Sequence, residues 1–316
     1  MINEKAFESI ISRAAGELGQ RIEALKQGYL QAWWQTEAAP PSFLTTYTLK
    51  EQQAIEQELS GFMERVVGYS ERYLPAAEPQ GLDFSEPIAQ TRMYVKKLFG
   101  LAGIEIDDAF TDGIVRSTTI FIDRVKNFDP AMSPENIYQA LRNIWIMNTL
   151  QVYFGMETGC SDSMFAYSML YPYTDNIMDD AATGPEEKMR SNDKLRLRLE
   201  GRPYFQPAGI EKKLDRLVEL VEQEFPRDRF PQVFQGLLGI YNAQIKSLAQ
   251  QNGDVPPHVV DIPGVSFEKG GTSVLADGYL VKGKLTGNQE AFCFGLGAFL
   301  QLADDIQDVV MDKKNN

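Results

Sequence analysis

The stretch FCFGLGAFLQLADDIQDVVM, residues 292–311, places carboxylates inside a strongly apolar segment with helical spacing. One face of that helix carries, at steps of four, three and four residues, Gly297, Gln301, Asp304 and Asp308. The neighbouring face is predicted to pack, and consists of Phe292, Leu296, Phe299, Ala303 and Val310. Because an isolated charge is costly to bury, carboxylates beside an apolar face need a cationic partner or a metal ion. The stretch therefore predicts a long helix that presents acidic groups to a cation.

Helical periodicity also runs through the rest of the chain, beginning with an N-terminal stripe from Phe7 to Leu25. Thr48 and Glu51 form a predicted capping box for a helix to about Tyr73, and Ser133 caps another that starts with Pro134. Further helices are predicted at about 88–102, 107–127, 134–155, 162–182, 186–200, 208–225, 231–251, 266–283 and 288–312. No window alternates with a period of two, and no repeat or compositional break divides the chain. These patterns predict one all-α bundle spanning residues 1–316.

Composition excludes several function classes. The chain has 316 residues, a net charge of −13, one histidine and two cysteines. A Ser-His-Asp hydrolase would need His258 itself, and a Cys/His zinc site lacks ligands. The acidic balance disfavours nucleic acid, because binding its phosphates requires clustered lysine and arginine. Without a signal sequence or a transmembrane segment, the protein is expected to be cytoplasmic.

A second acidic cluster lies in YPYTDNIMDD, residues 171–180. Asp175 and Asp179 are four residues apart and share a helical face with Asp180 beside them. Two like charges at this spacing cost a helix about 0.2–0.5 kcal/mol unless they are solvated or share a cation. A solvated acidic face is one interpretation. The other interpretation is that this cluster and the carboxylates of 304–308 form two facing walls that hold magnesium. Magnesium prefers oxygen ligands and is often bound together with substrate phosphates.

A positive charge comes from KGGTS, residues 269–273. Lys269 and Thr272 stand beside small residues where a helical pattern begins. A helix N-terminus with free amides and a lysine is suited to bind a phosphate group. The alternative interpretation is that the segment is an ordinary loop at the start of a helix, without a ligand.

In combination, these segments resemble the class I isoprenoid synthases, all-helical enzymes that ionise prenyl diphosphates. Residues 297–308 are similar to the G-x-x-x-Q-x-x-D-D-x-x-D motif of trans-prenyltransferases, and 175–180 are similar to the first aspartate-rich motif. The segments KGGTSVLADGYLV and YPYTDN are closer to the large-terpene synthases, the group that contains tetraprenyl-β-curcumene synthase. The resemblance is most specific over residues 160–312. It implies a helical bundle around a central cavity.

The resemblance also implies roles for individual residues. Three Mg²⁺ ions would be held by six aspartates: Asp175, Asp179, Asp180, Asp304, Asp305 and Asp308. All of these except Asp180 are also implied to be catalytic. The substrate would be bound by Lys269, Thr272, Gln301, Tyr171 and Phe165. The implied reaction is ionisation of a linear, long-chain prenyl diphosphate by a monomer or homodimer, with diphosphate release, a terpene hydrocarbon product and peripheral membrane contact.

Three departures keep alternatives open. Asn176 stands where elongating enzymes usually have an aspartate, no Arg-Arg pair follows Asp180, and the Asn-Ser-Glu triad of typical terpene cyclases is missing. A trans-prenyltransferase or head-to-head prenyl synthase is therefore the second hypothesis. Only eight residues follow Asp308, where the family has further helices, so the bundle is expected to lack C-terminal helices. An inactive helical scaffold or partner subunit is the third hypothesis.

Overall fold

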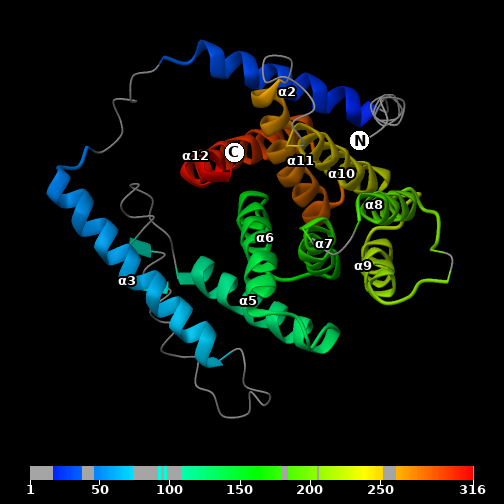
Figure 1. Ribbon diagram of the computed structural model, residues 1–316, viewed down its shortest axis with the longest axis horizontal. Helices are drawn as coiled ribbons and strands as arrows, with labels where there is room; N and C mark the ends of the chain where they lie inside the picture. The colour runs from blue at the N-terminus through cyan, green and yellow to red at the C-terminus, as the bar shows by residue number, and fades with distance from the viewer. Residues whose placement is uncertain are drawn as a thin grey trace. The chain divides into compact units, whose positions relative to one another are not determined.

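The computed structural model describes residues 17–37, 46–73, 92–93, 96–97, 108–179, 184–204, 206–251 and 261–315. At some helical positions, including 175–179 and 307–315, only the backbone is described. Every regular element in these ranges is an α-helix (Figure 1). The helices are α2 (Glu17–Gln35), α3 (Leu49–Tyr73), α5 (Asp108–Phe128), α6 (Pro134–Tyr153), α7 (Asp162–Asp179), α8 (Pro185–Leu199), α9 (Ile210–Glu224), α10 (Pro231–Gln251), α11 (Ile262–Lys282) and α12 (Gly287–Asn315). The prediction of an all-α protein is confirmed for the described residues.

Local capping fixes two of the predicted helix starts. The Glu51 carboxylate accepts from the Thr48 backbone N–H at 2.7 Å, and the Glu51 N–H donates to the Thr48 hydroxyl at 3.3 Å. This reciprocal pair is the predicted capping box at the start of α3. At α6, the Ser133 hydroxyl accepts from the N–H of Asn136 at 3.3 Å, so that cap is also confirmed. The predicted helix 88–102 and the stripe at Phe7 lie mostly outside the described residues.

Helix α11 begins earlier than its predicted start at residue 266. Asp261 is the N-cap, and its side chain accepts from the N–H of Gly264 at 3.0 Å. Pro263 lies in the first turn, where its missing N–H has no helical partner to lose. This proline therefore starts the helix and does not belong to an irregular segment.

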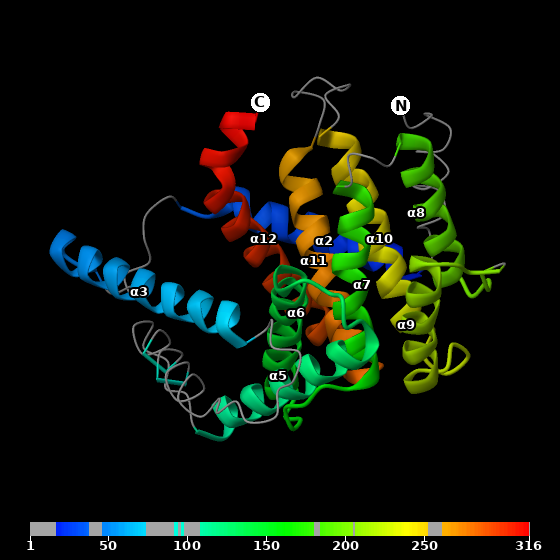
Figure 2. The same cartoon turned by 60° about the horizontal axis from the view of Figure 1, so that its bottom comes forward.

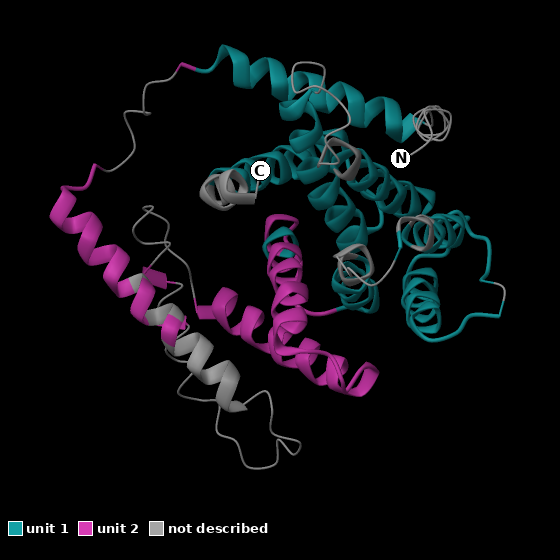
Figure 3. Ribbon diagram, viewed as in Figure 1, with its two compact units in different colours: residues 1–36, 149–151, 161–316 teal, residues 37–148, 152–160 magenta. Residues whose placement is uncertain are grey.

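Two compact units divide the chain (Figure 3). Unit 1 comprises Met1–Thr36, Thr149–Gln151 and Ser161–Asn316, and unit 2 comprises Glu37–Asn148 and Val152–Cys160. The prediction of a single domain over 1–316 stays a prediction. In unit 1, α11 packs against α2, α7, α10 and α12, and its residues from Gly270 to Val281 are buried apart from Ser273. This makes α11 the central helix of unit 1.

In unit 2, α5 and α6 each carry fully buried side chains, such as Phe121 and Ile144, both 0 % exposed. The indole N–H of Trp145 donates to the Thr118 hydroxyl at 2.9 Å. The amide of Asn148 donates to the carbonyl of Gly159 at 2.9 Å. Asn148 therefore contributes a hydrogen bond within its own unit.

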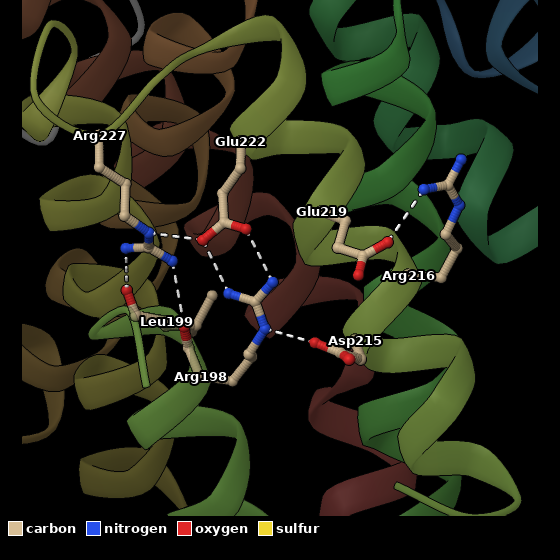
Figure 4. A network of polar contacts seen from close by, with 7 residues as sticks. All are labelled: Arg198, Leu199, Asp215, Arg216, Glu219, Glu222 and Arg227. Carbon is tan, nitrogen blue, oxygen red and sulfur yellow. Dashed lines mark hydrogen bonds and ion pairs between the residues drawn. The ribbon is translucent and has the colours of Figure 1, made fainter. Parts of the chain in front are cut away.

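A network of charged groups joins α8 to α9 (Figure 4). The buried guanidinium of Arg198 donates to both carboxylate oxygens of Glu222 at 2.7 Å, and to Asp215 at 2.5 Å. Arg227 donates to Glu222 at 2.6 Å and to the carbonyl of Leu199 at 2.6 Å, which satisfies an end group of α8. The network is structural, because each donor meets an acceptor of the same chain. None of the described helices has a stretch long and apolar enough to cross a membrane.

Candidate functional site

Helices α11 and α12 run antiparallel in close contact along most of α11. Near the end of α11, a Cβ on Gly278 would lie 2.8 Å from the Cys293 sulfur. In the middle, a Cβ on Gly270 would lie 2.3 Å from the carbonyl oxygen of Gly297. Near the start of α11, the Ser266 hydroxyl donates to the Asp305 carboxylate at 2.8 Å. These contacts place the start of α11 beside the aspartates of α12.

Helices α7 and α11 are also antiparallel. The Ser163 hydroxyl donates to the Leu280 carbonyl at 2.9 Å, and one turn further along α7 Tyr167 interacts with Ser273 and Asp277. Asp175 lies two turns after Tyr167, in the last turn of α7. Lys269 lies two turns before Asp277 on α11. The backbone of Asp175 therefore lies at about the level of Lys269 along the pair.

One end of unit 1 thus gathers all three segments that the sequence singled out. Figure 2 shows the start of α11 and the ends of α7 and α12 at this end. The segments are distant in the sequence but belong to helices of one compact unit. Comparisons with models of known families, with curated proteins and with solved structures found no match to this chain. The function proposed below therefore depends on this arrangement and on the residue types.

Two members of the stripe on α12, Gly297 and Gln301, contact α11. A Cβ on Gly270 would lie 2.5 Å from the Cβ of Gln301, so the Gln301 stem packs on α11. The Gln301 amide donates to Asp305 at 2.8 Å. Asp304 and Asp305 are both half-buried, and the Asp308 side chain lies outside the described residues. Carboxylate and amide oxygens at the edge of a helix pair are ligands of the type that Mg²⁺ prefers.

The predicted packing face of α12 is wrong at Phe292, Phe299 and Ala303, which are exposed, while Leu296 is half-buried. Phe299 is 66 % exposed and Phe292 is 37 % exposed, whereas Cys293, Phe294 and Ala298 are buried. The reason is close approach: glycine and alanine let α12 lie against the backbone of α11, and this turns the larger Phe299 outward. The Val310 side chain lies outside the described residues.

Lys269 and Thr272 do not stand at a helix N-terminus. Because α11 starts at Ile262, both residues lie at least one turn inside it, where backbone amides bond within the helix. The expected free amides are thus absent from this part of α11. The hydroxyl of Thr272, which is 1 % exposed, donates to the Glu268 carbonyl at 2.6 Å. Lys269 is half-buried, and it remains a candidate phosphate contact through its side chain alone.

The aromatic candidates on α7 differ in their surroundings. Phe165 is 2 % exposed and Tyr171 is half-buried. The Lys213 ammonium of α9 lies 5.4 Å from the centre of the Tyr173 ring. That contact assigns Tyr173 to packing against α9. Substrate contact by Phe165 and Tyr171 stays a prediction.

One buried polar residue of α11, Asp277, was not predicted from the sequence. Asp277 is 0 % exposed, and it interacts electrostatically with Tyr167 on α7 and Cys293 on α12. Burial and the negative charge of Asp277 raise the pKa of Tyr167 well above its ordinary value, so this phenol stays protonated. Lys269, Ser273 and Asp277 are spaced four residues apart, which was the available signal that they share one face of α11.

The metal cluster itself stays a prediction. Among the side chains that the structure describes, no three of the types His, Cys, Asp and Glu are grouped to hold a metal ion. The side chains of Asp175, Asp179 and Asp308, and the whole of Asp180, lie outside that set. The described part of the site therefore contributes Asp304, Asp305 and Gln301 at one wall.

Proposed function

We propose that this protein is a magnesium-dependent terpene synthase that ionises a linear prenyl diphosphate, releases diphosphate and forms a hydrocarbon when the resulting carbocation loses a proton. One observation carries the proposal: the acidic residues of α12 lie beside the start of α11, joined by the bond from Ser266 to Asp305, one turn before Lys269. A cation and two acidic segments at one end of three packed helices suit a metal-bound diphosphate. The fold proposed with this function is a class I isoprenoid synthase bundle around a central cavity.

The donor set fits magnesium, because the described groups near Lys269 are hard oxygen donors. Asp304 and Asp308 on α12, with Asp175 and Asp179 on α7, would hold the ions on two sides. When bound, Mg²⁺ neutralises the diphosphate and stabilises it as a leaving group. Lys269 contributes a further positive charge from α11, where developing negative charge on the leaving oxygens is stabilised electrostatically.

In this proposal, aromatic residues of α7 protect the carbocation from water. Loss of diphosphate leaves an allylic carbocation, which water would trap. Phe165 and Tyr171 lie toward the N-terminal side of Asp175 on the same helix. There they would exclude water and face the cation with aromatic rings, an attraction of about 0.5–2 kcal/mol for each ring.

The test is diphosphate release from single prenyl diphosphates of increasing chain length, with Mg²⁺ and without isopentenyl diphosphate. A hydrocarbon product supports the proposal, whereas activity only with isopentenyl diphosphate would assign an elongating transferase. Asp304→Asn and Asp175→Asn should each abolish release, and Asp162→Asn, at the exposed start of α7, should not. The inactive-scaffold hypothesis is favoured if Mg²⁺ with inorganic diphosphate neither binds nor raises the melting temperature.

A further inference from the structure

Asp305 has both carboxylate oxygens engaged by side chains of the protein. Oδ2 accepts from the Ser266 hydroxyl of α11 at 2.8 Å, and Oδ1 accepts from the Gln301 amide of α12 at 2.8 Å. One donor is across the helix pair and the other is one turn back on the same helix. The two bonds fix the carboxylate in the direction of α11.

The neighbouring aspartate has a different direction. Successive residues of an α-helix are rotated by about 100°, so Asp304 cannot share the orientation of Asp305. Asp305 accepts a hydrogen bond from Ser266 of α11. The two adjacent aspartates therefore differ in function: one contacts the neighbouring helix, and the other lies on the predicted metal stripe.

The helix pair is closest at Gly270 and Gly297, where the Gln301 stem also packs on α11. Gly270 and Gly297 approach backbone to backbone and set the distance between the helices, whereas a hydrogen bond between two side chains also favours one rotation of α12. The bond from Ser266 to Asp305 lies one turn from Gly270 along α11 and about two turns from Gly297 along α12. It therefore favours one rotation of α12 close to Lys269, which lies one turn from Ser266 along α11.

We propose that Ser266, Asp305 and Gln301 form a positioning unit that sets Asp304 against Lys269, and that Asp305 acts through this unit and not as a ligand of magnesium. This inference rests on the proposed function and refines it. Ser266 was not among the residues that the sequence analysis selected. Its place three residues before Lys269 puts it on the same side of α11.

The experiment compares Ser266→Ala, Ser266→Thr, Asp305→Asn, the double variant Ser266→Ala/Asp305→Asn, and Asp304→Asn. For each, kcat, KM and the Mg²⁺ concentration for half-maximal rate are measured, with the melting temperature as a check of folding. Displacing a catalytic group by about 1 Å can cost about 100-fold in rate. We therefore expect Ser266→Ala and Asp305→Asn each to lower kcat by about 10-fold to 100-fold while the Mg²⁺ requirement stays unchanged.

Two further results are expected of a single unit. The double variant should be no slower than the slower single variant, because both changes act on the same contact between Ser266 and Asp305. Ser266→Thr keeps a hydroxyl and should restore most of the rate. Asp304→Asn should instead raise the Mg²⁺ requirement or abolish the reaction.

Different results overturn different claims. If Asp305→Asn raises the Mg²⁺ requirement as Asp304→Asn does, while Ser266→Ala has no effect, Asp305 is a metal ligand and the positioning unit is refuted. Calorimetry of Mg²⁺ with inorganic diphosphate provides a readout besides activity. If Asp304→Asn and Asp175→Asn leave that binding unchanged, the proposed function itself fails, and this inference fails with it.

Discussion

Gly270 and Gly297 lie backbone against backbone where α11 crosses α12. A Cβ on Gly297 would stand 2.0 Å from the Gly270 carbonyl oxygen, and one on Gly270 would stand 2.3 Å from that of Gly297. No side chain fits at either position without moving a helix. This crossing sets the distance between Lys269 on one helix and Gln301 on the other, so the candidate site depends on two residues that have no side chain.

The first prediction concerns this crossing. Gly297→Ala and Gly270→Ala should each lower the free energy of unfolding by about 1–3 kcal/mol or more, because the methyl group must push α11 and α12 apart. Urea unfolding measures the change. Gly28→Ala in α2 is the matched control, since a Cβ there meets nothing within 4 Å. It should stabilise the helix by about 0.5–1 kcal/mol. Equal effects at Gly28 and Gly297 would contradict the close crossing.

Helix positions could be predicted well because their signals are local. The bonds between Thr48 and Glu51, and the cap formed by Ser133, involve residues three apart in the sequence. The start of α11 at Ile262 lies four residues before its predicted start at residue 266, because proline is accepted in a first turn and Pro263 lies there. Periodicity therefore located the helices, and capping chemistry decided their ends.

The packing partners could not be predicted in the same way. Periodicity showed two adjacent faces on α12, but only the fit of Gly297 against Gly270 decides which one turns inward. The bond from Ser266 to Asp305 joins residues that are distant in sequence and carry no shared motif. Likewise, the burial of Asp277 follows from three packed helices, not from its neighbours in the chain. Such relationships exist only in the assembled unit.

The second prediction concerns Arg198, which is 6 % exposed. Arg198→Ala removes the guanidinium that bridges Glu222 and Asp215, and leaves Asp215 without this partner. Loss of one partner from a buried pair costs about 3–5 kcal/mol, which urea unfolding would measure. Arg216→Ala is the control, because Arg216 and Glu219 form a pair at 2.9 Å with both side chains about half exposed. That change should cost under about 1 kcal/mol.

The third prediction is a pH dependence of stability from Glu222. Hydrogen bonding to Arg198, and then to Arg227, lowers the pKa of this carboxyl below its ordinary value of 4.5. The folded state then binds fewer protons than the unfolded state as the pH falls below that value. The contribution to stability is therefore present above pH 4.5 and lost under more acidic conditions. Glu222→Gln should be less stable at pH 7 and should flatten the acid limb of the unfolding free energy.

The fourth prediction concerns Glu268, which is 8 % exposed on α11 and pairs with lysines of two other helices. Lys26 of α2 lies 3.3 Å from one of its oxygens, and Lys246 of α10 contacts the other. Either Lys26→Met or Lys246→Met leaves one cation in place, and each should cost about 1.5–3 kcal/mol. The double variant leaves a buried carboxylate without either lysine, so its cost should exceed the sum of the single costs.

The matched control for Glu268 is neutralisation of the carboxylate. Adding Glu268→Gln to the double lysine variant should recover stability, because the buried charge is then gone. If the double variant is merely additive and Glu268→Gln recovers nothing, the carboxylate is solvated once the lysines leave. Denaturant unfolding of all four variants decides between these results.

The last prediction uses the two thiols to follow the helix pair directly. Cys293 is 0 % exposed on α12 against α11, and burial, with the negative charge of Asp277, raises the pKa of this thiol to about 12. Cys160 is half-buried. Since the thiolate is the reactive form, a thiol reagent at pH 8 should modify Cys160 rapidly and Cys293 only when α12 separates from α11. In Cys160→Ala only the slow phase should remain, and Gly297→Ala should accelerate it by the same opening that destabilises the crossing. Equal rates for both thiols in the native protein would show that α12 separates from α11 freely.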